Sequence, residues 1–140
     1  MTRSEALSFL RRHRFCVQTS ASVAGVPQAA VVGFAVSDDL EIVFDTLDST
    51  RKIGNLARNP QVALVVGCGP EEQTAQIQGV ADLPAGADLE RLKKVYFAAW
   101  PDGVTRERWE GIRYVRVRLT WFRFSDFAHP GGPRVVEVAL

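Results

Sequence analysis

The sequence predicts a mostly β (α+β) domain, an antiparallel barrel of about six strands with two or three peripheral helices. Short segments rich in β-branched residues recur along most of the chain. Sequences typical of tight turns separate several of them, and the crossover helices that a parallel sheet needs between most strands are missing. A chain of 140 residues, 46% hydrophobic and 24% charged, suits one globular domain, so we assign residues 1–140 to a single unit.

A first helix is predicted at the N-terminus. Thr2 and Glu5 fit the capping-box pattern, and apolar residues at helical spacing continue to about Arg14. Four strands are expected next, at residues 15–21, 28–36, 41–46 and 61–67. Residues 24–27 and 37–39 have the composition of hairpin turns between the first three strands.

The remaining elements are predicted in the same way. A short basic helix over residues 51–58 ends before Pro60, because the residue before a proline disfavours the α conformation. Residues 87–99 carry apolar side chains at helical spacing and form the second long helix. Further strands are expected at residues 74–82, 112–119 and 121–127, with a last short one in the tail at 134–140.

The charge balance argues against nucleic acid as a partner. Seventeen Lys and Arg residues against sixteen Asp and Glu residues leave a formal charge of +1, which creates no broad field to attract a polyanion. No stretch approaches the roughly 20 apolar residues that cross a bilayer, and the charged N-terminus does not resemble a secretory signal. We therefore expect a soluble, cytoplasmic protein with neither a nucleic-acid nor a membrane partner.

The two cysteines, Cys16 and Cys68, favour reduced thiols. Both lie in apolar, strand-like surroundings, and neither belongs to a CxxC motif or a Cys/His cluster. We therefore expect no disulfide and no metal site.

Hydroxyl and basic side chains gather where a predicted strand turns into the short basic helix. They are Thr46, Ser49, Thr50, Arg51 and Lys52. With Ser49 or Thr50 as the cap, the helix start offers unpaired backbone N–H groups and a partial positive charge to an anion. An ordinary cap with a solvated basic face is the alternative, but two cations in a first turn oppose the helix dipole. Their sign therefore favours a bound negative group, such as a single phosphate.

A longer motif surrounds this corner. The segment FDTLDSTRKIGNLARNPQVAL follows the pattern F-x-T-x-x-S-x-(R)-K-x-x-N-L-x-x-N-P-x-V-A-L. This pattern, in a β-rich chain of this length, resembles the pyridoxamine 5′-phosphate oxidase-like family of FMN-binding split barrels, and the likeness covers most of the chain. The resemblance implies a six-stranded antiparallel split barrel that forms a homodimer, with two FMN sites across the dimer interface.

The resemblance also implies cofactor-binding roles for individual residues. Arg51 and Lys52 match the basic pair that holds the flavin phosphate, with Thr50 at the hydroxyl position beside it. Asp45 and Thr46 match the pair at the strand end that touches the cofactor.

The resemblance implies that three further positions contact the flavin ring. The strand at residues 30–35 matches the one that runs along the isoalloxazine, where backbone groups around Val32 would face the ring. Trp121 and Arg123 lie in the region that approaches the flavin of the partner subunit in family members. Core or dimer packing is the alternative role for aromatic residues that alternate on such a strand.

Several departures from the family pattern bear on the substrate. The true vitamin oxidases carry an arginine and a lysine where this chain has Ala30 and Ala35, and a glutamine where it has Thr74. The chain also stops at Leu140, without the longer segment that grips pyridoxal phosphate. Oxidation of pyridoxamine phosphate is therefore not expected, and the substrate is left as an unidentified small molecule.

Three functions remain open at this stage. The first is an FMN-dependent oxidoreductase that uses NAD(P)H or another donor, in which the flavin carries the redox step. The second is a reductase dependent on the deazaflavin F420, and the third is a flavin- or haem-binding protein without turnover. No catalytic residue is assigned, because His13 and His129 both stand in positions where a histidine is usually structural or solvated.

Two other features have competing interpretations. The basic residues of segment 91–108 suggest a second anion site, but a solvated helix face is the default because acidic residues lie among them. Trp100 and Trp109 could cover a substrate or attach the second long helix to the barrel.

Overall fold

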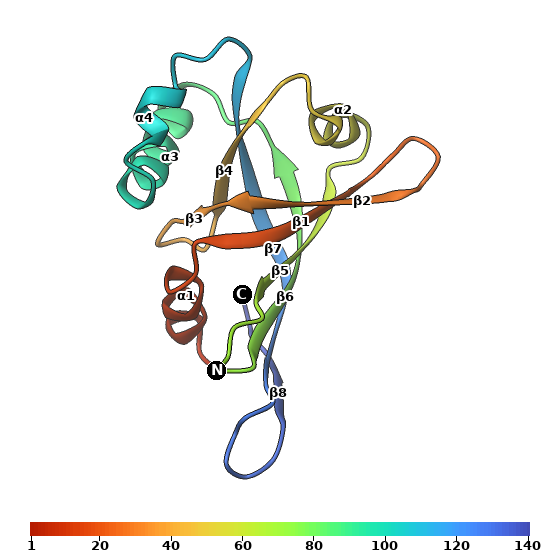
Figure 1. The fold of residues 1–140 in the computed structure, drawn as a ribbon, viewed down its shortest axis with the longest axis vertical. Helices are drawn as coiled ribbons and strands as arrows, with labels where there is room; N and C mark the ends of the chain where they lie inside the picture. The colour runs from red at the N-terminus through yellow and green to blue at the C-terminus, as the bar shows by residue number, and fades with distance from the viewer.

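The computed structural model describes residues 1–140 and shows a single curled antiparallel sheet with four helices around it (Figure 1). The strands are β1 (Phe15–Ala21), β2 (Pro27–Gly33), β3 (Ala35–Val36), β4 (Ile42–Leu47), β5 (Gln61–Gly67), β6 (Gln73–Asp82), β7 (Ile112–Asp126) and β8 (Arg134–Glu137). The helices are α1 (Arg3–Arg11), α2 (Arg51–Arg58), α3 (Gly86–Ala99) and α4 (Gly103–Arg106). The mostly β, antiparallel architecture is therefore confirmed.

The strands follow the order β2-β1-β5-β6-β7-β4-β3, and β8 also pairs with β7. The long strand β7 connects the parts of this half-barrel. Its first half pairs with β4 and its last residues with β8, while β6 runs along its other edge. The terminal strand β2 pairs only with β1, and the β1–β2 hairpin projects from the body in Figure 1.

Two predicted strand boundaries were wrong. The expected strand at residues 28–36 is interrupted at Phe34, where the chain leaves β1 and continues along β4 as β3. The two strands expected at residues 112–119 and 121–127 are one strand of 15 residues. Leu119 lies opposite Gly79 and Trp121 opposite Gln78, so the residue between them forms a β-bulge instead of a turn.

The helix predictions hold with small changes. The Thr2 hydroxyl accepts a hydrogen bond from the Glu5 N–H at 3.2 Å, and the Glu5 carboxylate accepts one from the Thr2 N–H, which confirms the capping box. Helix α1 ends at Arg11, three residues before the predicted end, and α2 has the predicted bounds. The four-residue helix α4 was not anticipated from the sequence.

The main hydrophobic core lies inside the curled sheet and beneath α1. Side chains such as Phe9, Leu64, Ile77 and Phe122 meet there with less than 2% of their surface exposed. A smaller core attaches α3 to the other side of β3, β4 and β7. No helix combines the length and apolar character needed to span a membrane.

Helix α3 is attached to the sheet by polar contacts as well. The Trp100 indole N–H donates to the Phe34 carbonyl at 3.0 Å, and the indole packs on Gly33, where a Cβ would come within 2.5 Å of it. The buried Arg116 side chain forms a bidentate pair with Asp82 at 2.7 and 2.8 Å and a hydrogen bond with Asp88 of α3 at 2.9 Å. These contacts hold α3 in place, as the second interpretation of Trp100 proposed.

Candidate functional site

The corner between β4 and α2 brings the predicted hydroxyl groups together. The Thr46 side chain lies on the same face of β4 as that of the buried Phe44, because alternate residues of a strand share a face. The Thr46 and Thr50 hydroxyl oxygens lie 3.2 Å apart. The Thr50 hydroxyl donates to the Leu47 carbonyl at 2.8 Å, which closes the turn before the helix. The Ser49 side chain, in this turn, is exposed.

Helix α2 begins without a side-chain cap. Thr50 occupies the predicted N-cap position, but its hydroxyl makes no capping hydrogen bond to the helix. The backbone N–H groups of Arg51 and Lys52 donate to no other group of the protein, and the first turn contains no acidic residue. These N–H groups and the positive end of the helix dipole are therefore free to bind an anion.

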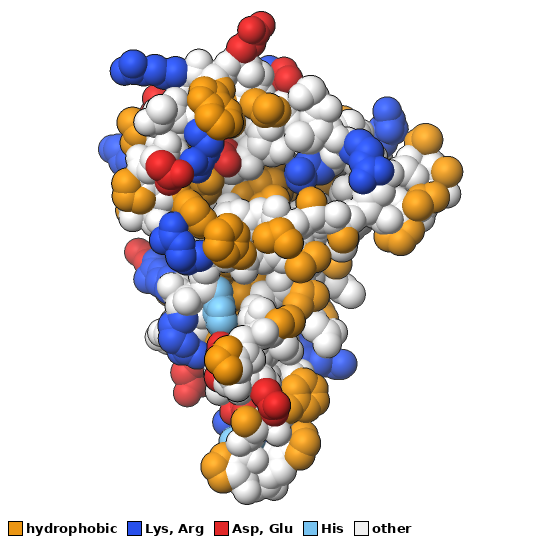
Figure 2. Space-filling model, in the orientation of Figure 1, with side chains coloured by type: hydrophobic (Ala, Val, Ile, Leu, Met, Phe, Trp, Pro, Cys, Tyr) orange, Lys and Arg blue, Asp and Glu red, His pale blue; other side chains and the backbone are white.

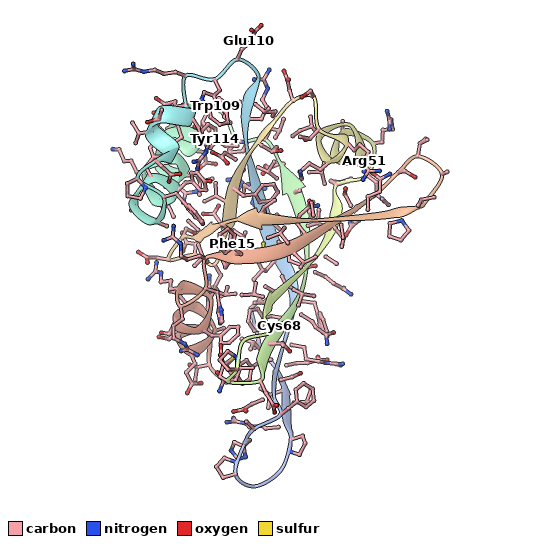
Figure 3. The ribbon with its side chains drawn as sticks, viewed as in Figure 1. Phe15, Arg51, Cys68, Trp109, Glu110 and Tyr114 are labelled. Carbon is pink, nitrogen blue, oxygen red and sulfur yellow. The ribbon has the colours of Figure 1, made fainter.

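Lys52 differs from the other partly buried cations of the chain. Five Lys and Arg side chains are not fully exposed, namely Lys52, Lys93, Arg106, Arg116 and Arg123. All of them except Lys52 have a carboxylate oxygen within 4.0 Å. Burial, and secondly the charge of Arg51, lower the pKa of Lys52 below its ordinary value. Arg51 is exposed and also has no carboxylate partner; in Figure 3 it lies between α2 and the β1–β2 hairpin.

Asn55 fixes the orientation of α2. Its side-chain amide donates to the Ser20 hydroxyl at 3.1 Å and to the Gln28 side-chain oxygen at 2.9 Å, which connects the helix to β1 and β2. Asn55 is 5% exposed, and its hydrogen bond to Ser20 is buried while that to Gln28 is partly buried. Sequence reasoning assigned no role to these residues, although the asparagine of the motif, three residues after Lys52, was a signal that could have identified the contact.

Asp45 lies on the opposite face of β4 from Thr46. Its carboxylate accepts a hydrogen bond from Arg106 Nε at 2.7 Å, beneath α3 and α4. The same guanidinium donates to Asp102 at 2.6 Å and to the Tyr96 hydroxyl at 3.1 Å. Of the two strand-end residues, only Thr46 therefore directs its side chain toward the hydroxyl turn.

Val32 directs its side chain toward the main core, and its own backbone N–H and C=O groups face β1. It is half-buried, packs against the core cluster and pairs with Cys16 of β1. Because β2 is the last strand of the sheet, the outward-facing backbone groups on either side of Val32, those of Val31 and Gly33, have no strand partner. These groups are available to a planar molecule with hydrogen-bonding edges.

Trp121 and Arg123 lie on a different surface from the corner. They stand opposite Gln78 and Gln76 on β7, and the Arg123 guanidinium lies 5.0 Å from the centre of the Trp121 ring. Arg123 also pairs with Glu137 of β8 at 2.9 Å. No hydrogen bond or ion pair joins either residue to the hydroxyl turn within one chain.

The face that carries Trp121 and Arg123 continues across the sheet. Strand registers place one row of side chains across β2, β1, β5, β6 and β7, namely Val31, Val17, Val65, Gln76 and Arg123. The neighbouring row is Ala29, Thr19, Ala63, Gln78 and Trp121. Val31 is 67% exposed, and Figure 2 shows apolar side chains along the projecting hairpin. We call these two rows the outer face.

The basic residues of segment 91–108 are mostly paired with acids. Arg91 binds Glu41 at 2.7 Å, and Lys93 lies 3.4 Å from Glu90. Together with the Arg106 contacts, these pairs support a surface network and not a second anion site.

The largest cavity does not include the corner. It has a volume of about 480 Å³ and lies between α1, β3 and α3, where His13 is its one histidine. His13 Nε2 is buried without a partner, its ring lies 4.6 Å from that of Phe9, and burial lowers its pKa. No group of three His, Cys, Asp or Glu side chains is arranged to hold a metal ion.

Comparison with known proteins agrees with this architecture. The sequence model of the pyridoxamine 5′-phosphate oxidase family matches residues 2–125. A haem-binding protein from Mycobacterium smegmatis superposes with a TM-score of 0.80 at 16% identity, over 95% of this chain and 56% of that protein. The chain thus spans little more than half of that relative.

Two further structures cover most of both chains. A pyridoxamine 5′-phosphate oxidase-like protein from Listeria innocua has a TM-score of 0.68 at 20% identity, over 86% of this chain and 95% of its own. The haem storage protein HutZ from Vibrio cholerae has a TM-score of 0.73 at 12% identity, over 84% and 89%. No curated protein matches the sequence. Because the family model covers most of the sequence and the sheet has the split-barrel topology, this chain belongs to the pyridoxamine 5′-phosphate oxidase family.

Proposed function

We propose that the chain binds FMN with its phosphate at the β4–α2 corner and acts as a flavin-dependent oxidoreductase on a small organic molecule. The observation that carries this proposal is the uncapped start of α2 beside Lys52, a half-buried cation with no carboxylate partner. Leaving a partly desolvated ammonium unpaired costs free energy, and a bound phosphate would remove that cost.

The donor set of the corner fits a phosphate monoester. Free backbone N–H groups, the hydroxyls of Thr46 and Ser49 and two cationic side chains lie in a contiguous stretch of chain, from Thr46 to Lys52. A phosphate accepts several charge-assisted hydrogen bonds at once, and Arg51 can offer two parallel donors. The corner therefore suits a compact dianion better than a carboxylate.

A second copy of the chain would complete the proposed site. The outer face exposes apolar side chains on β1 and β2, and its far end carries Trp121 and Arg123. Packing two such faces would bury this surface and could bring Trp121 and Arg123 of one subunit to the flavin of the other. We therefore propose a homodimer with FMN at its interface, in which the free edge of β2 near Val32 contacts the ring.

FMN, when bound, supplies hydride transfer, and the protein positions it. The residues along the ring-side strand determine what else can bind there. Ala30, on β2, provides no charged side chain, and Ala35 lies in β3, buried in the smaller core beneath α3. A substrate at this site would be held by shape and backbone hydrogen bonds more than by charge, which agrees with the expected loss of pyridoxamine phosphate oxidation.

Flavin titration tests the phosphate site directly. The double variant R51A/K52A should keep the fold and weaken FMN binding by about 2 to 5 kcal/mol, because two charge-assisted contacts are lost. R58A is the matched control, since Arg58 is an exposed, unpaired cation at the other end of the same helix. Quenching of flavin fluorescence measures the affinity. If R51A/K52A and R58A bind FMN equally well, the corner does not hold the phosphate.

Haem binding is the second candidate, because two structural neighbours are a haem-binding and a haem storage protein. Absorbance spectra of the protein mixed with hemin, FMN or F420 distinguish the cofactors. Retention of flavin bands after gel filtration supports the proposal. A stable Soret band with no flavin retained would favour haem, and retention of F420 alone would favour a deazaflavin reductase.

A further inference from the structure

Two acidic residues lie beside the proposed phosphate site: Asp48, which is exposed and paired with Arg113 at 3.2 Å, and Asp45, which is the more buried of the two. Asp45 directly precedes Thr46 in β4, and its carboxylate is largely buried, with 13% of the side chain exposed. A buried carboxylate so close along the chain would repel a phosphate at the corner, because partial burial weakens screening by water. Some other group has to offset this charge if the corner is to attract an anion.

Arg106 is positioned to provide that offset. Its guanidinium lies 2.7 Å from the Asp45 carboxylate and is itself only 20% exposed. Two further contacts, to Asp102 and the Tyr96 hydroxyl, fix its orientation. The Asp45–Arg106 pair lies on the face of β4 opposite the hydroxyl turn.

From this geometry we propose that Arg106 is a positioning residue of the anion site: it neutralises Asp45 behind β4 and so preserves the affinity of the corner for phosphate. This inference rests on the proposed function, because it concerns the same site. The inference also gives a role to α4, which lies outside the family motif. Arg106, its last residue, is 61 residues from Asp45 in the sequence.

A purely structural role for Arg106 predicts a different pattern of effects. If Arg106 only attached α4 to the barrel, its loss would weaken all ligands alike, and removing the Asp45 charge as well would give no recovery. If Arg106 neutralises Asp45, its loss weakens phosphorylated ligands selectively, and the added D45N change restores them. A double-mutant cycle separates the two roles.

The experiment measures binding of FMN and of riboflavin, which lacks the phosphate, to five proteins: the unaltered chain, R106Q, D45N, the double variant D45N/R106Q and R108Q. Arg108 is the control, because it is an exposed arginine two residues away with no carboxylate partner. We expect R106Q to bind FMN about fivefold to tenfold more weakly, as one uncompensated charge nearby would produce. D45N/R106Q should recover to within about twofold of D45N, and riboflavin binding should change by less than about twofold throughout.

Three results would overturn the inference while leaving the proposed function in place. The first is that R106Q weakens FMN and riboflavin binding equally, and the second is that D45N/R106Q binds FMN no better than R106Q. The third is equal FMN affinity of R106Q and R108Q. If the unaltered chain does not bind FMN, the proposed function fails and the inference fails with it. Thermal unfolding of each variant without ligand shows whether the fold is retained, and R106K, which keeps the charge, should bind FMN better than R106Q.

Discussion

The hydroxyl oxygens of Thr46 and Thr50 lie 3.2 Å apart, across the turn that joins the last residues of β4 to the start of α2. The Thr50 hydroxyl donates its only hydrogen to the Leu47 carbonyl. The Thr46 hydroxyl is therefore the donor in the hydrogen bond between the two threonines. When an anion is bound, the Thr46 hydroxyl can donate to it instead. Thr50 therefore stabilises the turn, while the Thr46 hydroxyl can rotate toward a bound anion.

Replacing Thr46 with valine removes this hydroxyl and keeps the shape of the side chain. We expect T46V to bind FMN about 1 kcal/mol more weakly, since one hydrogen bond to a charged oxygen is lost. Fluorescence titration measures the change. T105V, at an exposed position of α4, is the control and should bind as the unaltered chain does. Weaker binding of riboflavin by the same amount would show that Thr46 does not act on the phosphate.

Replacing Gly79 or Gly54 with alanine should change the free energy of unfolding in opposite directions. A Cβ on Gly79 would lie 2.5 Å from Val117 Cγ1 and 2.6 Å from the Arg118 carbonyl oxygen, at the bulge between β6 and β7. G79A should therefore lower the free energy of unfolding by about 2 kcal/mol or more. On α2, a Cβ on Gly54 meets nothing closer than 4.0 Å, and G54A should raise this free energy by up to about 1 kcal/mol. Urea unfolding measures both free energies. If G79A is as stable as the unaltered chain, β7 cannot pack against Gly79 as closely as these distances indicate.

The outer face should govern the oligomeric state. A charge at Val31, which is 67% exposed, should disrupt the proposed dimer, because burying an unpaired carboxylate in the interface is unfavourable. V31D is expected to sediment as a monomer and to bind FMN more weakly. V104D is the control, since Val104 is 52% exposed on α4, away from the outer face. A monomeric unaltered chain that binds FMN fully would contradict the shared site.

Stability should decrease in acid because of the carboxylates around Arg116. Hydrogen bonds, chiefly from Arg116 to Asp82 and from Arg91 to Glu41, lower the pKa of the two carboxylates below their ordinary values of 3.8 and 4.5. A lowered pKa in the folded state means that these groups stabilise the fold above about pH 4.5 and lose this contribution as the pH falls through the folded values.

The variant R116L tests this pH dependence. It should be less stable at pH 7, because Asp82 loses its bidentate partner, and its stability should change less between pH 5 and pH 3 than that of the unaltered chain. Urea midpoints at the three pH values measure both effects. R118L, which removes a single exposed contact to Asp82, is the control. An equal loss of stability in acid for R116L and the unaltered chain would exclude Arg116 as the cause.

Much of the candidate site could be predicted because it is local. Thr46, Thr50, Arg51 and Lys52 lie within seven consecutive residues, and Pro60 marks the end of α2 soon after. The sequence could not show that Lys52 would be the partly buried cation without a carboxylate, because this depends on where every distant acid lies. The same holds for Asp45, which only the folded chain pairs with Arg106.

By itself, the sequence determined the local elements: the capping box of α1, the alternating burial of β1 and β5, and the short basic helix, since these follow from backbone preferences and side-chain spacing within a few residues. Only the tertiary structure decided that the extended segment changes partner at Phe34 and that β7 continues through a bulge. Both outcomes depend on which strand lies alongside, and such pairings join residues far apart in the chain. Local propensity therefore predicts that a segment is extended, while long-range packing determines where it breaks and which side chains it places together.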